Sequence, residues 1–291
     1  MLNPNSNPSL PPLFVGCPMW THPKWHQNWF GTAKAGLADY AQQCSSVEGN
    51  TSFYQTPTQE RAQQWASVVP ADFRFTLKLP REITHNHKLN SVKDILAAFW
   101  HAIVPMQSKL GALMAQLPAS FGPEHLPQLR QFIEHYHLPV PLAVEVRHLA
   151  FFAKGAEERA LNRLLVENKV NRVIMDTRAL FATPPQSHLE EEVQQKKPRV
   201  PVNVIATGGQ PIVRFVGGNT AAINEQKLLP WITKCHQWRQ QGKTPFVFIH
   251  CPDNADAPAL LRRFITLYNS SYPDASLPEL SFASEVQASL L

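Results

Sequence analysis

The chain has 291 residues and a formal net charge of +5, with 44% hydrophobic and 17% charged residues, which supplies a sizeable core and excludes general disorder. It has no run of about 18 apolar residues, and its first twelve residues carry neither positive charge nor an apolar run, which excludes a spanning helix and a signal peptide. We expect a cytoplasmic protein without a membrane partner, with a disordered leader at 1–12 and one domain at 13–291.

Eight short runs along the chain are typical of buried strands. In order they are 13–17, about 45–50, 73–78, 110–116, 142–147, 172–176, 211–216 and 246–250. Helical spacing is found between most of them, at about 32–43, 58–68, 91–104, 124–136, 155–168 and 224–240, and again at 257–268 after the last. A longer connection at about 177–210 carries two adjacent prolines and a short helix near 189–195. The chain thus predicts alternating strands and helices.

Alternating strand and helix units predict a parallel sheet, either open and doubly wound or closed into a barrel. The number of strands and the absence of a glycine-rich turn after the first favour the closed α/β form, a (β/α)8 TIM-like barrel. In such barrels the chemistry lies at the carboxyl ends of the strands. The residues at those ends are therefore the candidates for a functional site.

Polar and ionisable side chains end nearly all of these strands. They are Glu48, Asn50, Lys78, Gln116, Glu145, Arg147, Asp176, Arg214 and His250. In the third strand Phe75 and Leu77 share one face and Lys78 lies on the other, as a barrel with a polar interior requires. Interior ion pairs without any site are the structural alternative. Because desolvating so many charges is costly, we favour a solvated or ligand-filled pocket at the barrel mouth.

The mixture of charges indicates a ligand class. Lys78, Arg147 and Arg214 can neutralise a phosphate or a carboxylate, and Asn50, Gln116 and His250 can add hydrogen bonds. Glu48, Glu145 and Asp176 can transfer protons, with pKa values set by the neighbouring cations. We expect an enzyme or ligand-binding barrel for a small anionic molecule; if it is an enzyme, a hydrolase, lyase or isomerase.

Loop residues provide further candidates. His85, just after the third strand, is either a general acid or base or a histidine that caps a loop. Trp20 and Tyr54 either stack on a substrate or pack as part of a lid. The basic run 196–199 directly follows three glutamates, which indicates a solvated mixed-charge face more than a nucleic-acid patch.

No cofactor is predicted from these residues. A divalent metal held by the carboxylates with His250 is an alternative, which the convergence of three cations disfavours. Nucleic acid, bound or processed at the same face, is the alternative partner. The sequence carries no signal of an oligomeric state.

Several of these stretches resemble the YecE-like family, also called domain of unknown function 72. The resemblance is carried by Val47-Glu48-Gly49-Asn50-Thr51-Ser52-Phe53-Tyr54, Ala143-Val144-Glu145-Val146-Arg147-His148 and His250-Cys251-Pro252-Asp253-Asn254. It implies a TIM-barrel fold with a pocket, and no particular activity. The family commonly has Arg-x-His-Gly after the seventh strand, whereas this chain has Arg214-Phe215-Val216-Gly217. A role for that histidine therefore does not carry over.

Overall fold

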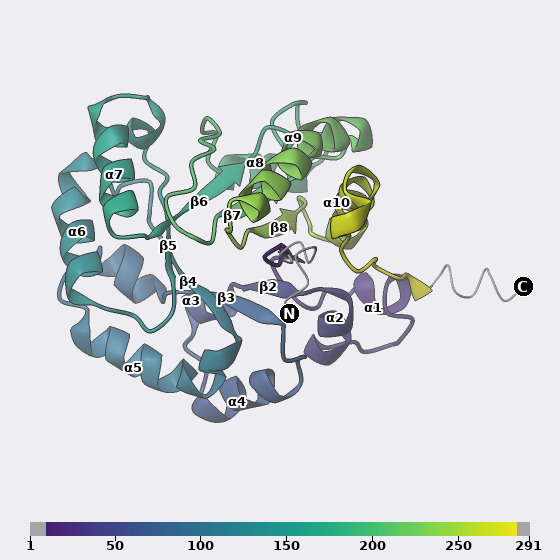
Figure 1. The fold of residues 1–291 in the computed structure, drawn as a ribbon, viewed down its shortest axis with the longest axis horizontal. Coiled ribbons are helices and arrows are strands. Elements are labelled where there is room, and N and C mark those ends of the chain that lie inside the picture. Colours follow the sequence, from purple (N-terminus) through teal and green to yellow (C-terminus); the bar gives the residue numbers. More distant parts are fainter. Residues whose placement is uncertain (1–9, 284–291) are drawn as a thin grey trace, which may run out of the picture.

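A closed ring of strands surrounded by helices forms the molecule (Figure 1). The structure is a computed structural model that describes residues 10–283. Its eight parallel strands are β1 (Phe14–Gly16), β2 (Ser46–Gly49), β3 (Arg74–Lys78), β4 (Leu110–Gln116), β5 (Leu142–Glu145), β6 (Asn171–Asp176), β7 (Ile212–Val216) and β8 (Phe246–His250). The predicted TIM-like barrel is confirmed.

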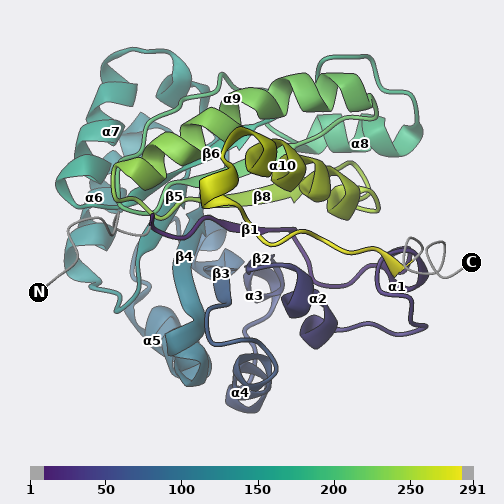
Figure 2. The ribbon, with the colours of Figure 1, turned by 45° about the vertical axis from the view of Figure 1, so that its right-hand side comes forward.

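Helices lie between successive strands and cover the outside of the barrel (Figure 1). They are α1 (Trp25–Asn28), α2 (Leu37–Gln43), α3 (Thr51–Tyr54), α4 (Gln59–Ser67), α5 (Lys93–Ile103), α6 (Leu126–His135), α7 (Ala156–Glu167), α8 (His188–Lys196), α9 (Ala221–Gln240) and α10 (Ala257–Ser271). Figure 2 shows α8 and α1 on the same side of the molecule, while α9 and α10 pack side by side. No helix within residues 10–283 is long and apolar enough to span a membrane.

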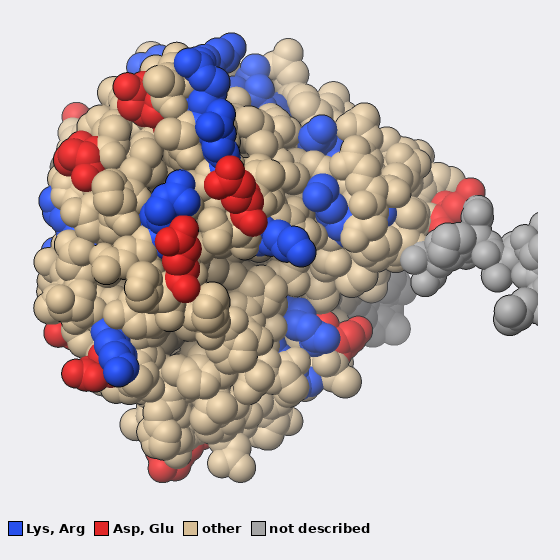
Figure 3. Space-filling model, turned by 60° about the vertical axis from the view of Figure 1, so that its left-hand side comes forward, with Lys and Arg blue, Asp and Glu red and all other residues tan. Residues whose placement is uncertain are grey.

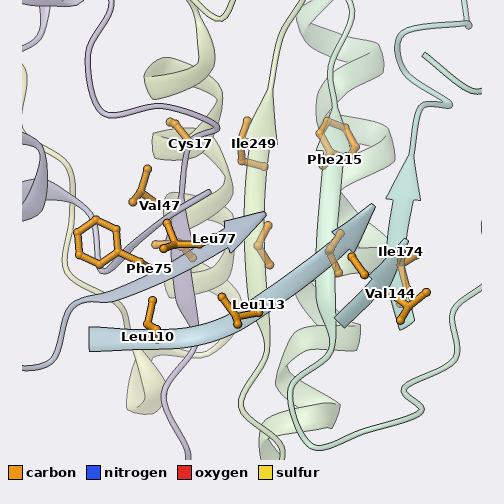
Figure 4. Packing of buried hydrophobic residues seen from close by; sticks show 14 of the residues in the cluster. Cys17, Val47, Phe75, Leu77, Leu110, Leu113, Val144, Ile174, Phe215 and Ile249 are labelled. Carbon is orange, nitrogen blue, oxygen red and sulfur yellow. The ribbon is translucent and has the colours of Figure 1, made fainter. Parts of the chain in front are cut away.

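Alternation along the strands divides the core into two layers. Outward-facing side chains such as Phe75, Leu113 and Phe215 pack in one large cluster with residues of the helices (Figure 4). A second cluster fills the barrel interior and consists of Phe14, Ala112, Met114, Ala143, Val173, Ile212, Phe246 and Phe248. The charged side chains of Glu48, Glu145 and Arg214 lie above this apolar floor, at the carboxyl end of the interior.

The sheet closes at a seam between β1 and β2. The two strands are the ends of the hydrogen-bonded order β1-β8-β7-β6-β5-β4-β3-β2. The Tyr40 hydroxyl accepts from the Cys17 N–H at 2.7 Å and donates to the Ser46 C=O at 2.8 Å, while the Glu48 N–H donates directly to the Cys17 C=O at 3.1 Å. Gly16 permits this approach, because a Cβ there would lie 1.9 Å from the Ser46 oxygen.

The ends of some elements differ from the predictions. The helix expected from residue 32 begins at Leu37, because Gly36 is extended and its N–H donates to Asp39 Oδ2 at 2.8 Å as an N-terminal cap. The fifth strand ends at Glu145 rather than at 147. Of the expected leader, residues 1–9 lie outside the described residues, and the Pro11 C=O accepts from Arg239 Nε at 2.6 Å.

Candidate functional site

A pocket of about 590 Å³ opens at the carboxyl ends of the strands. The β1–α1 loop, the β2–α3 turn and the end of α8 form its walls, and strand ends form its base. Its lining residues are Pro18, Met19, Trp20, Thr21, Glu48, Asn50, Thr51, Tyr54, Lys78, Gln116, Arg147, Val193, Lys196, Lys197, Arg214, His250 and Asn254. Most of the strand-end side chains that were predicted to lie together at the barrel mouth therefore line this pocket.

Arg214 lies at the centre of a buried network of charges. Its Nε and Nη2 donate to the two carboxylate oxygens of Glu48 at 2.7 and 2.9 Å, and its Nη1 donates to Glu145. The three side chains come from β7, β2 and β5, and each is almost fully buried. Since each alternates with outward-facing apolar neighbours, the three meet inside the barrel above its apolar floor.

This network holds both carboxyl groups in the ionised form. Burial alone would raise the pKa of Glu48, but the charge of Arg214 outweighs it and, with the neighbouring Lys78, keeps the pKa well below its usual range. Burial would also raise the pKa of Glu145, but the charge of Arg214, followed by that of Arg147, outweighs burial and lowers this pKa to about 2. Neither group carries a proton to donate at neutral pH, so both act there as counter-ions to the arginines.

His250 is buried beside Glu48, with its Nε2 at 3.1 Å from Glu48 Oε2. Burial lowers the pKa of His250 to about 4, against the opposing charge of Glu48. At neutral pH the ring is therefore uncharged, and because the carboxylate only accepts, we assign the ring proton to Nε2. His250 is thus a hydrogen-bond donor that fixes the position of Glu48.

We expect the His250 imidazole to stay neutral between about pH 5 and pH 8. Because the folded protein favours the uncharged ring, its nitrogen signals in a histidine-selective NMR titration should keep the Nε2–H pattern over that range. A His250→Gln variant would identify the signals. A titration midpoint near the ordinary value of about 6.5 would contradict this assignment.

Lys78 and Arg147 extend the network towards the open pocket. Lys78 Nζ donates to Gln116 Oε1 at 2.6 Å and lies 3.8 Å from Glu48 Oε1; burial, followed by the charge of Arg214, lowers its pKa to about 8. Arg147 Nε donates to Glu145 Oε1 at 2.9 Å, and its side chain is 21% exposed. Arg147 lines the pocket, and its Nη groups have no partner among the described residues. They are therefore available to a ligand.

The predicted loop candidates lie at the rim. Asn50 Nδ2 donates to the Pro18 C=O at 2.8 Å and so ties two walls of the pocket together. Tyr54 is 80% exposed at the opening, and Trp20 packs edge-on against another tryptophan. His85 is outside the lining; it contacts Phe53, and burial followed by Arg147 lowers its pKa.

Asp176 lies away from the pocket, contrary to its predicted place in the shared mouth. Its carboxylate accepts from Trp231 Nε1 of α9 at 2.8 Å and from the Arg178 guanidinium at 2.9 and 2.7 Å. Asp176 lies on the same face of β6 as Arg172, whose Nη2 donates to the Phe151 C=O outside the barrel. The strand therefore directs Asp176 towards the surrounding helices. The metal alternative built on Glu145, Asp176 and His250 therefore has no common site. Within residues 10–283 no group of His, Cys, Asp and Glu side chains is arranged to hold a metal ion.

Lys196 and Lys197 were assigned from the sequence to a solvated face, yet both line the pocket. The missed signal was Pro198, since the residue before a proline is extended and ends the helix. Lys197 accordingly has φ −89° and ψ 138° at the end of α8, which turns it away from the exposed face of the helix. The mixed charges of this run therefore did not indicate that Lys197 lies in the pocket.

Comparisons with known proteins agree over nearly the whole chain. The family model described as "Protein of unknown function DUF72" matches residues 14–282. The "UPF0759 protein YecE" of Escherichia coli strain K12 and that of strain O157:H7 are each 39% identical to this chain over 249 residues, covering 86% of it and 90% of their own length.

Solved structures of DUF72 family proteins share the fold. One from Enterococcus faecalis V583 has a TM-score of 0.70 at 21% identity and covers 92% of this chain and 98% of its own. One from Thermotoga maritima MSB8 has a TM-score of 0.64 at 20% identity, with coverage of 90% and 99%. At these identities the likeness is one of fold.

Proposed function

Because this chain belongs to the DUF72 family, whose description assigns no activity, we propose a function from its own pocket: it binds a small anionic molecule, bearing a phosphate or carboxylate, as an enzyme or ligand-binding barrel. A pocket of about 590 Å³ fits a metabolite-sized ligand. The ligand would lie over the strand ends, where this fold carries its chemistry.

The excess of positive charge around the pocket carries this proposal. Three cations, Lys78, Arg147 and Arg214, share two carboxylates, those of Glu48 and Glu145. Lys197 adds a further amine that has no ion-pair partner among the described residues. Since uncompensated buried charge is costly, an anion in the pocket would relieve it.

The division of work within the pocket follows from these pairings. Arg214 is saturated by the two glutamates and serves as the base of the site, so Arg147 and Lys78 are the groups left to contact an anion. Proton transfer at neutral pH suits a group whose pKa lies near 7. Lys78 and Lys197 meet that condition better than Glu48 and Glu145.

An Arg147→Met variant is expected to bind a small anion about 10- to 100-fold more weakly, because a hydrogen bond to a charged group contributes about 1.5–3 kcal/mol. Isothermal titration with inorganic phosphate and with pyruvate would measure the loss. The matched control is Arg130→Met, since Arg130 is an exposed residue of α6 paired with Glu134. Equal affinity of both variants and the parent protein, or no binding by the parent, would refute the proposal.

The nucleic-acid alternative makes a different prediction on the same protein. Binding to an abasic or single-stranded oligonucleotide should weaken steeply with added salt. On the face shown in Figure 3, basic and acidic side chains are interspersed rather than gathered by sign, so that face offers no basic tract to a nucleic acid. At the barrel mouth, the metabolite-sized volume of the pocket favours the small-molecule proposal. Tight oligonucleotide binding with such a salt dependence would reverse this order.

A further inference from the structure

Lys197 is set into the pocket by the backbone that precedes Pro198. Helix α8 ends at Lys196, and Lys197 is extended, with its N–H donating to the Val193 C=O at 2.9 Å. The Thr177 hydroxyl donates to the Pro198 C=O at 3.1 Å, which holds the following backbone in place. A proline and a hydrogen bond to the loop after β6 thus fix where this side chain begins.

The Lys197 amine differs from every other cation of the pocket. Arg214, Arg147 and Lys78 each have a carboxylate within 4 Å, and Lys196 is paired with Glu192 at 2.8 Å. Within residues 10–283, Lys197 makes no hydrogen bond through its amine and no ion pair. Its nitrogen is therefore not held by another group and is available to a ligand.

The surroundings of Lys197 favour the uncharged amine. Burial has the largest influence, followed by the positive charge of Arg214, and together they lower the pKa of Lys197 to about 7 against the opposing charges of Glu48 and Glu145. About half of the molecules would then carry a neutral amine at pH 7, on the order of a thousandfold more than for a lysine with the ordinary pKa. A desolvated amine beside another cation is an activated nucleophile.

We propose that Lys197 is the nucleophile of this pocket and forms an imine with an aldehyde or ketone group of the bound anion. The inference rests on the proposed function, because the anion-binding groups would bring the carbonyl to the amine. The Nζ lone pair adds to the carbonyl carbon, whose π electrons move to oxygen, and a proton passes from nitrogen to that oxygen. Protonation of that hydroxyl and its loss as water leave the protonated imine, which returns the proton on conversion to the imine, so one amine and one carbonyl give one imine and one water.

An imine at this position decides between the reaction classes left open by the sequence. The protonated imine accepts electrons from a bond at the adjacent carbon, so a C–H or C–C bond there is weakened. That chemistry belongs to lyases and isomerases acting on 2-oxo acids or on phosphorylated aldehydes and ketones. Arg147 or Lys78 would hold the anionic group while the carbonyl reacts with Lys197.

Reductive trapping tests the proposal directly. The protein would be incubated at pH 7 with sodium cyanoborohydride and, separately, pyruvate, glyoxylate or glyceraldehyde 3-phosphate, then mapped by peptide mass spectrometry. We expect the reduced adduct on Lys197 to exceed that on an ordinary exposed lysine by about tenfold or more with at least one compound, because of its larger neutral fraction. Inorganic phosphate should compete with the labelling.

Two variants separate the imine from simple anion binding. Lys197→Arg keeps the charge but cannot form the imine, so it should bind the anion by titration and give no adduct in this segment. Lys93→Arg, at an exposed lysine of α5 outside the lining of this pocket, should label as the parent protein does. Anion binding without an adduct on Lys197, or labelling spread evenly over exposed lysines, would overturn the imine and leave the proposed function standing. Absence of anion binding in the parent would overturn both.

Discussion

Replacing Arg214 with methionine is expected to destabilise the protein by about 3–5 kcal/mol, measured as the free energy of unfolding in urea at pH 7. The guanidinium holds the buried carboxylates of Glu48 and Glu145, and methionine would leave both without their shared counter-ion. Lys78 and Arg147 compensate only part of the charge, since Lys78 lies 3.8 Å from Glu48. A loss below about 1 kcal/mol would mean that the network contributes little to the folded state.

The same variant should show a reversed dependence of stability on pH. In the parent protein the pKa values of Glu48 and Glu145 are lowered, so their contribution is present above the unfolded value of about 4.3 and lost as the pH falls towards the folded values. Without Arg214, burial raises both pKa values, and folding then takes up protons. The difference in unfolding free energy between variant and parent should therefore shrink from pH 8 to pH 5.

The control variant also removes the two buried carboxylates that Arg214→Met leaves without a counter-ion. A triple variant with Glu48→Gln, Glu145→Gln and Arg214→Met has no buried ion pair left to break. Since apolar or neutral replacements of a whole buried network are often close to neutral, the triple variant should recover much of the lost stability. If it is no more stable than Arg214→Met alone, the loss came from packing rather than from unpaired charge.

Removing the Tyr40 hydroxyl is expected to have the second large effect. In Tyr40→Phe the buried Cys17 N–H and Ser46 C=O would both lose their partner, at a cost of about 1–3 kcal/mol for each group. The phenyl ring would still fill the same space, so the loss in unfolding free energy reports the hydroxyl alone. Urea unfolding would measure it, and hydrogen exchange of the Cys17 amide should speed up in parallel.

Tyr54→Phe is the matched control, because Tyr54 is 80% exposed and has no hydrogen bond of this kind among residues 10–283. It should change the stability by no more than a few tenths of a kcal/mol. If both variants unfold like the parent protein, the seam closes by direct backbone bonding and the Tyr40 bridge is dispensable.

The fold was predictable because its signals are local. Eight apolar runs separated by helical spacing define the strands and helices, and strict alternation in the third strand placed Lys78 inside the barrel correctly. The β1–β2 seam was not predictable, since it depends on a tyrosine of α2 meeting two strands whose spacing only the closed barrel sets. Long-range geometry of that kind leaves no periodic trace in a sequence.

The site was predictable where alternation along a strand decides which way a side chain faces. Glu48, Glu145 and Arg214 follow alternation and meet inside the barrel. Asp176 also ends a strand, but it lies with Ile174 on the outward face of β6. Lys197 was missed because charge composition describes an average environment and cannot tell which lysine of a pair turns inwards. The relation between Lys197 and Pro198 was the only local sign of its position.

The β1–β2 seam has a consequence for the synthesis of the chain. The first strand forms its hydrogen-bonded ladder with the last, in which Phe14 is in register with Phe246. Among the described residues, its nearer sequence neighbour β2 forms no ladder with it and is joined to it by side-chain bonds of Tyr40 and Ser45 and by the Glu48 N–H. A growing chain leaves the ribosome from its N-terminus, so β1 lacks its ladder partner until residues 246–250 have emerged. The barrel therefore closes only after nearly all of the polypeptide has been translated.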